Sequence, residues 1–140
     1  MLYDKDIREP LFDFLEDRYG KIRIIEEKRM GRSRADVVMV LPGTIMGIEI
    51  KSDADTYARL KRQVKDYNRF FDSNIVAVGS THAAHIEEHV PSWWGIITVE
   101  EIDRTADFYM LREPGPNPRT NIKKKLGLLW RPELAHIQDI

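Results

Sequence analysis

The dipeptide Pro42-Gly43 divides the most apolar part of the chain into two short runs. The run before it reads RADVVMVL and the run after it reads TIMGIEIKS. Each has the length of a strand and is rich in β-branched residues. Proline followed by glycine suits the two central positions of a type II turn. The chain is therefore expected to form a hairpin here, from two strands that are apolar on both faces, as buried strands are.

Charged side chains interrupt this hairpin. On its second strand Gly47, Glu49 and Lys51 share one face, because side chains alternate along a strand. A two-residue loop would place Asp36 directly opposite Glu49, with Cβ atoms about 4.5–5.5 Å apart. A four-residue loop would place Asp36 opposite Lys51 and keep both acids on one face, whereas a three-residue loop would separate them. Gly47 is expected to leave room beside the acids for substrate backbone.

Two carboxylates that face each other repel and need a compensating partner. A divalent cation such as Mg²⁺ meets this need, because it takes oxygen ligands and typically one or two carboxylates. The alternative is that Asp36, Glu49 and Lys51 are ordinary charges paired at a solvent-exposed strand edge. The apolar character of both strands favours the cation site, since charges on buried strands need partners.

Further elements surround the hairpin. Periodicity and turn residues predict helices over about 6–19, 55–71 and 82–90 and from about 123, and strands over 21–29, 74–80, 94–100 and 107–113. Asp6 and Glu9 have the spacing of a capping box at the start of the first helix. The order is α-β-β-β-α-β with later additions, which indicates an α/β fold with a mixed sheet flanked by helices. The helix after the hairpin predicts one parallel crossover.

Composition restricts the class of protein. The 140 residues, 42% of them hydrophobic, fit a single domain over 1–140. The absence of cysteine excludes disulfides and thiolate metal sites. No leader pattern and no membrane-spanning apolar run is found, so we expect a cytoplasmic protein without a membrane partner.

The charge is close to balanced but unevenly placed. The net charge is −1 and the pI is about 6.4, less basic than a dedicated nucleic-acid binder. Basic residues nevertheless gather in the segments KRMGRSR, RLKRQVK and RTNIKKK. A neutral total can hide a basic groove, so the net charge does not exclude a nucleic-acid partner.

Taken together, these motifs resemble the PD-(D/E)XK nuclease superfamily. Asp36 in RAD is followed after twelve residues by EIK with Glu49 and Lys51, within an αβββαβ order. The segment QVKDY, with Gln63 and Tyr67, is similar to the Q-x-x-x-Y motif of the RecB-like branch. The stretch through VPSWWGI to LLWRPE resembles a small, poorly characterised bacterial and phage family in that superfamily. Alanine precedes Asp36, where the superfamily has proline.

The resemblance implies a restriction-endonuclease-like fold and a role for each motif residue. Asp36 and Glu49, with the carbonyl of Ile50, would hold Mg²⁺ or Mn²⁺. Lys51 would orient the attacking water or offset charge on the phosphate; its alternative is a simple counter-ion. Gln63 would reach the phosphate or a metal-bound water.

Additional contacts are expected around this centre. Glu27 is a candidate third acidic ligand, with Glu26 and Glu9 as alternatives. The helix after the hairpin supplies candidates for binding nucleic acid, with core packing or a solvated helix face as the alternative: Lys61, Arg62, Lys65 and Tyr67.

Other polar and aromatic residues are given structural interpretations. The three histidines His82, His85 and His89 are predicted on a helix surface. Trp93 and Trp94 are predicted to cover the edge of the sheet, with base stacking as the alternative. The lysines over 123–125 either bind phosphates or are solvated.

The predicted function is a Mg²⁺- or Mn²⁺-dependent deoxyribonuclease that acts on DNA in repair, recombination or phage–host conflict. The main alternative is a non-catalytic nuclease-fold module that binds nucleic acid or a protein partner. A third is an effector or inhibitor that uses the scaffold for protein contact. Duplex cutting by one small site would be easiest in a homodimer.

Overall fold

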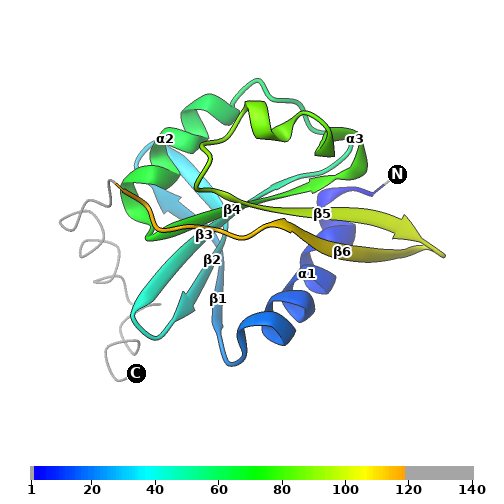
Figure 1. The fold of residues 1–140 in the computed structure, drawn as a ribbon, viewed down its shortest axis with the longest axis horizontal. Helices are drawn as coiled ribbons and strands as arrows, with labels where there is room; N and C mark the ends of the chain where they lie inside the picture. Colours follow the sequence, from blue (N-terminus) through cyan, green and yellow to red (C-terminus); the bar gives the residue numbers. More distant parts are fainter. Residues whose placement is uncertain (1, 119–140) are drawn as a thin grey trace.

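The computed structural model describes residues 2–118, which form a six-stranded mixed sheet with helices on both faces (Figure 1). The predicted α/β fold class is confirmed, and the first six elements follow the predicted αβββαβ order. The helix predicted from about 123 lies outside the described residues. The elements are α1 (Asp4–Tyr19), β1 (Arg23–Met30), β2 (Ser33–Leu41), β3 (Thr44–Lys51), α2 (Leu60–Phe70), β4 (Ser73–Gly79), α3 (Ser80–Ala83), the 3₁₀ helix η1 (Ile86–Glu88), β5 (Gly95–Ile102) and β6 (Thr105–Arg112).

The strands lie in the sheet in the order in which they occur in the sequence. The pairs β1–β2, β2–β3 and β5–β6 are antiparallel. The pairs β3–β4 and β4–β5 are parallel. Helix α2 therefore makes the predicted parallel crossover, and the segment carrying α3 and η1 makes a second one. Strand β3 lies in the interior of the sheet, as its apolar sequence indicates.

Each face of the sheet has its own core (Figure 1). On one face α1 buries Ile7, Leu11 and Leu15 against the sheet. On the other face α2 buries a stripe that includes Val64 and Tyr67. No helix within the described range 2–118 is long and apolar enough to span a bilayer.

The β2–β3 hairpin has the two-residue loop that the sequence allowed. Leu41 pairs with Thr44 and Val38 pairs with Gly47. Gly43 has φ +75°, the positive value that a type II turn needs at its second central residue. This register carries Asp36 and Glu49 to opposing positions, so the first of the three predicted arrangements is the one observed.

Helix α2 is shorter than predicted. It begins at Leu60 rather than near 55. The preceding segment is held by Asp55, whose Oδ2 accepts the Ser52 amide at 2.8 Å and the Ser52 hydroxyl at 3.0 Å. Short polar side chains that bond local backbone compete with helix formation, which explains the late start.

The helix predicted over 82–90 is wrong in its extent, because α3 and η1 are separate short helices. The histidines also do more than cover a surface. The His82 Nε2 lies 3.0 Å from the Ser52 carbonyl and its Nδ1 lies 3.0 Å from the Tyr57 hydroxyl. His89 stacks on Tyr57 with ring centroids 4.0 Å apart. These contacts pack the loop before α2 against the segment that carries α3 and η1.

Helix α1 begins two residues earlier than predicted. Asp6 Oδ2 accepts the Tyr3 amide at 2.9 Å, so the cap is built from Tyr3 and Asp6 and not from the predicted Asp6–Glu9 pair. Pro10 consequently lies inside the helix, in its second turn.

The prediction that Trp94 covers the sheet edge is also wrong. Trp94 is fully buried, its Nε1 donates to Asn68 Oδ1 at 2.8 Å, and its ring meets that of Tyr67 with centroids 5.4 Å apart. A partner for the indole N–H allows the whole ring to enter the core.

Candidate functional site

The candidate site lies where the ladder between β2 and β3 stops. The last pair of the ladder on this side is Val37 with Ile48. One residue further, the Asp36 side chain takes the place of a backbone partner, and its Oδ2 accepts the Ile50 amide at 2.8 Å. Asp36 is thereby fixed beside β3, close to Glu49.

A buried tyrosine connects the two acids. The Tyr67 hydroxyl lies 2.7 Å from Glu49 Oε1 and 3.0 Å from the Ile48 carbonyl, and it accepts the Asp36 amide at 3.1 Å. Tyr67 is fully buried, so core packing is the observed one of its two predicted roles. Contact with nucleic acid would require this side chain to leave the core.

Gly47 provides the space for this tyrosine rather than for substrate. A Cβ at position 47 would lie 2.6 Å from Tyr67 Cδ1 and 2.5 Å from Phe71 Cδ2. The expected room for substrate backbone is therefore filled by two aromatic rings from α2 and the residue after it.

Burial dominates the electrostatics of the acids. The pKa of Glu49 is raised to about 8, first by burial and then by the charge of Asp36, against the lowering effects of the Tyr67 hydrogen bond and the Lys51 charge. Burial also raises the pKa of Asp36, against the lowering effects of the Ile50 amide, a hydrogen bond with Glu49 and the Arg8 charge. At neutral pH the pair therefore retains a proton when no other cation is bound.

Lys51 lies on the same face as Glu49, as strand alternation predicts. Its Nζ is 3.6 Å from Glu49 Oε2, and both side chains are nearly buried. A buried ammonium beside a buried carboxylate is suited both to pairing with it and to facing an anionic substrate. The contact alone does not separate these two predicted roles.

Arg8 of α1 is a site residue that the sequence reasoning missed. Its Nη1 donates to the Asp36 carbonyl at 3.1 Å, and its Nη2 lies 3.5 Å from Asp36 Oδ1 and 2.6 Å from Glu27 Oε1. Burial lowers the pKa of Arg8, but Asp4, Asp36 and Glu27 together raise it above its ordinary value. Arg8 follows the buried Ile7 in the sequence, but only the packing of α1 on the sheet shows which acids it reaches.

The acids of β1 are held by this arginine. Glu27, the favoured third ligand, is bound to Arg8, as is Glu26 at 3.4 Å, and Glu9 makes none of these contacts. Glu27 has φ +53° and lies opposite Asp36 at the one interrupted position of the β1–β2 ladder. Glu27 therefore lies next to the candidate site and forms an ion pair with Arg8.

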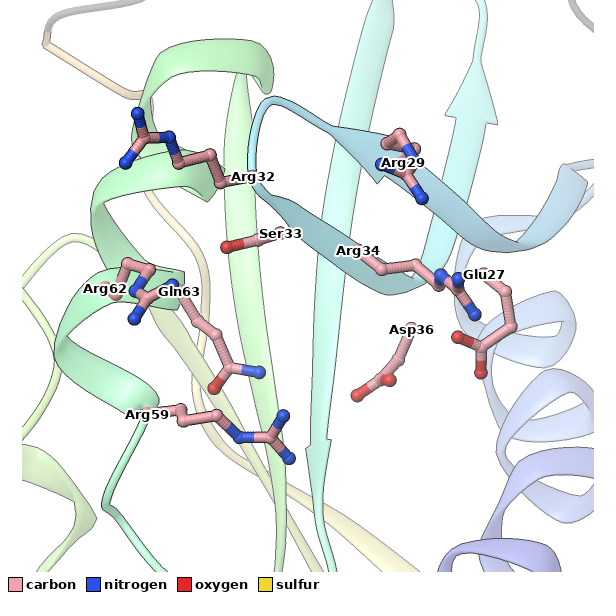
Figure 2. A pocket seen from close by; sticks show the side chains of 9 residues that line it. All are labelled: Glu27, Arg29, Arg32, Ser33, Arg34, Asp36, Arg59, Arg62 and Gln63. Atoms are coloured by element: carbon pink, nitrogen blue, oxygen red, sulfur yellow. The ribbon is translucent and has the colours of Figure 1, made fainter.

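A pocket of about 370 Å³ opens beside Asp36 (Figure 2). Glu27 and Asp36 reach it from β1 and β2, and Gln63 reaches it from α2. Gln63 Oε1 is buried and has no hydrogen-bond partner among the described residues. A buried acceptor without a partner is costly, and the place of Gln63 in the lining of this pocket makes it a candidate ligand contact.

Five arginines line the same pocket. The β1–β2 hairpin supplies Arg29, Arg32 and Arg34, and the start of α2 supplies Arg59 and Arg62. All five are exposed. Two basic segments recognised in the sequence therefore meet at one place in the fold.

The other predicted contacts on α2 lie elsewhere. Lys61 and Lys65 are exposed but do not line this pocket. Of the lysines and arginines predicted on α2 to bind nucleic acid, the pocket includes Arg62 alone. The lysines over 123–125 lie outside the described residues.

The residues fit a divalent cation in their chemistry, though not as a three-acid cluster. Within residues 2–118 no group of three or more histidines or acids is placed to hold a metal. Asp36 and Glu49 offer carboxylate oxygens on neighbouring strands, and burial raises the pKa of both carboxyls. Mg²⁺ typically needs only one or two carboxylates, with further oxygen ligands from elsewhere.

Comparison with known proteins finds a distant structural neighbour and a distant relative. The structure of Pyrococcus furiosus SfsA in complex with Ca²⁺ matches with a TM-score of 0.43 and 15% identity, covering 79% of this chain and 60% of that one. Protein cII of Enterobacteria phage P4 is 22% identical over 140 residues, covering 98% of this chain and 53% of the relative. The chain thus spans about half the length of this relative. The Bacteriophage P4 protein cII family matches residues 1–139, and the chain belongs to that family.

Proposed function

We propose that this protein is a divalent-metal-dependent deoxyribonuclease that hydrolyses phosphodiester bonds, built on a PD-(D/E)XK nuclease fold. The observation that carries the proposal is the convergence of Asp36, Glu49 and Lys51 beside a pocket lined by arginines. Glu49 is a buried acid with a raised pKa, and Asp36 beside it has a raised pKa and lines the basic pocket, which makes the pair a candidate functional site.

The hairpin supports the proposal through its geometry. In the observed register the acid of the first motif and the Glu-x-Lys of the second share a face of the sheet. The αβββαβ order around them is the order that the resemblance implies. Element order and motif geometry therefore agree.

In this proposal Asp36, Glu49 and the Ile50 carbonyl hold Mg²⁺ or Mn²⁺. Such an ion supplies Lewis acidity toward a phosphoryl oxygen and lowers the pKa of bound water. Tyr67 keeps the Glu49 carboxylate in position through its hydroxyl. Lys51 places positive charge next to Glu49, where it can offset charge that develops on a phosphate.

We assign substrate binding to the pocket beside Asp36. Gln63 lines the pocket and its side-chain oxygen has no partner within residues 2–118, so it is the side chain assigned to contact a water or a substrate donor. The arginines supply bidentate donors that match phosphate oxygens. Kinship with a phage protein fits a role in phage–host conflict, with repair and recombination as the other settings.

One observation favours the non-catalytic alternative. The acid oxygens already have partners within the chain: Tyr67 and Lys51 for Glu49, and the Ile50 amide and Arg8 for Asp36. A purely structural network would show the same contacts. In that case the arginines would bind nucleic acid without cutting it.

Cleavage and binding measured together separate these functions. The purified protein would be incubated with plasmid, linear, branched and single-stranded DNA in Mg²⁺ or Mn²⁺, next to the Asp36→Asn and Lys51→Ala variants. Lys21→Ala, which removes an exposed lysine before β1, is the matched control.

We expect cleavage by the wild type and the Lys21 variant and loss of cleavage in the other two. DNA binding without cleavage of any substrate would establish the binding module instead. Cleavage that survives both Asp36→Asn and Lys51→Ala would remove these residues from the reaction.

A further inference from the structure

The pocket beside Asp36 holds more positive charge than the fold requires. Its lining has five arginines and two acids, Glu27 and Asp36, a formal excess of three positive charges in a protein whose net charge is −1. Like charges gathered at one place repel each other. An anionic ligand would offset this repulsion.

The arginines are also available for a ligand. Within residues 2–118, no hydrogen bond or ion pair occupies the guanidinium groups of Arg29, Arg32, Arg34, Arg59 and Arg62. By contrast, Arg8 and Arg69, which lie outside the pocket lining, are paired with acids. Unpaired arginines are thus concentrated in the pocket.

The shape of the site favours the end of a strand over its middle. A volume of about 370 Å³ is near the lower limit of small-molecule sites, which span about 300–1,000 Å³. The arginines come from two elements on different sides of the cavity, the β1–β2 hairpin and the start of α2, rather than from a single row (Figure 2). A basic groove that follows a continuous backbone would have its charges in a row.

The charge count points to a phosphomonoester. A terminal phosphate carries about −1.5 to −2 at pH 7 and three acceptor oxygens, whereas a phosphodiester within a strand carries a single charge. The terminal group therefore gains more from several guanidinium groups. No aromatic side chain is among the described residues that line the pocket, so base stacking would contribute little there.

We infer that the arginine-lined pocket binds the phosphate-terminated end of a nucleic-acid strand, with little dependence on base sequence. Because Asp36 lines the same pocket, a phosphate held there places the adjoining nucleotide next to the acids. This inference rests on the proposed function for its cleavage step, but binding of the end does not require cleavage. The 5′ and 3′ phosphates share this chemistry and are distinguished by experiment.

The test is equilibrium binding of the full chain, in EDTA, to short fluorescent DNA strands of one sequence. The strands carry a 5′ phosphate, a 3′ phosphate or hydroxyls at both ends, and single-stranded and duplex forms are compared. We expect one phosphorylated end to bind about tenfold or more tightly than the hydroxyl strand, since a charge-assisted contact contributes on the order of 1.5–3 kcal/mol. Equal affinity for all three ends would overturn the inference.

Arginines of the lining provide the variants, and an exposed lysine outside the lining provides the control. Arg59 and Arg62 line the pocket and Lys21 does not, although all three are exposed. Arg62→Ala combined with Arg59→Ala should remove most of the preference for the phosphate, whereas Lys21→Ala should leave the preference intact. A preference that survives the double arginine variant would overturn the inference.

Failure of this inference and failure of the proposed function have different signatures. Preferential binding of a phosphorylated end, without cleavage in Mg²⁺ or Mn²⁺, would support the pocket and remove the nuclease. Cleavage that is independent of the terminal phosphate, with equal binding of all ends, would remove the pocket and keep the nuclease.

Discussion

Replacing Glu49 by glutamine should change how the stability of the protein depends on pH. Glutamine has the same shape, and its amide oxygen can still accept the Tyr67 hydroxyl that lies 2.7 Å from Glu49 Oε1. What it removes is the titration of a carboxyl that is 2% exposed and lies beside Asp36. The variant therefore isolates the energetic effect of ionising this buried group.

The size and sign of this effect on stability follow from the raised pKa of Glu49. Burial, chiefly, raises the pKa of Glu49 from 4.5 to about 8 in the folded protein. Between these values the folded protein keeps a proton that the unfolded chain has lost. The stabilisation is therefore complete below pH 4.5 and is lost as the pH rises to about 8. The slope is about 1.4 kcal/mol per pH unit, with an upper bound of about 5 kcal/mol over the interval.

The assay is urea unfolding in EDTA at half-unit steps from pH 5 to pH 9, for the wild type and the Glu49→Gln variant. The free energy of unfolding of the variant should rise relative to that of the wild type by about 1 kcal/mol per pH unit up to pH 8 and then level off. Glu100→Gln, which changes an exposed acid of β5, should give a curve parallel to the wild type. Parallel curves for Glu49→Gln as well would refute the assignment of a buried, protonated carboxyl.

Three further predictions concern residues around the acids. Tyr67→Phe removes the hydroxyl that bonds to Glu49 and leaves buried polar groups without a partner. This should lower the free energy of unfolding by about 1–3 kcal/mol. A change below about 0.5 kcal/mol would contradict the hydrogen bonding assigned to Tyr67. Gly47→Ala forces a Cβ into two aromatic rings and should lower the free energy of unfolding by about 1–3 kcal/mol. Gly115→Ala, where the nearest atom to the new Cβ is at 3.6 Å, should lower it far less. Equal losses of stability in thermal unfolding would refute the close packing of Gly47 against these rings. Arg8→Gln removes the cation that pairs with acids of α1, β1 and β2. The free energy of unfolding should fall by about 1 kcal/mol at pH 7 and by less at pH 3, where those acids are protonated. A loss of stability that does not depend on pH would contradict this role of Arg8.

The hairpin shows what the sequence could predict. Alternation along β3 and the Pro42-Gly43 turn determine which side chains share a face, so the proximity of Asp36 to Glu49 followed from local geometry. The observed strands also have nearly the bounds predicted from the apolar runs, because each run ends at turn residues. Helix ends agreed less well. Ser52 and Asp55 delay α2 through hydrogen bonds that propensity alone does not reveal.

The remainder of the site depends on contacts between segments distant in the sequence. Arg8 reaches Asp36 only because α1 packs on the face of the sheet where its buried stripe directs it. The arginine pocket exists because the β1–β2 hairpin packs beside α2, where the Ser33 hydroxyl bonds to Asp66, and this brings the arginines of the hairpin near Arg59 and Arg62. Both basic segments were visible in the sequence, but their meeting point depends on tertiary packing. Trp94 entered the core for a similar reason, since Asn68 supplies a partner for its indole.

Proton and metal should compete at the acids. A bound divalent ion requires Glu49 to be ionised, so its affinity should increase as the pH rises toward the pKa of about 8. A crystal soaked in Mn²⁺ at pH 8 tests the central claim most directly, through its anomalous diffraction signal. The proposed metal site predicts a peak bonded to both Asp36 and Glu49 that disappears in the Glu49→Gln variant. A fully soaked crystal with no peak at these carboxylates, or with one that persists in the variant, would contradict it.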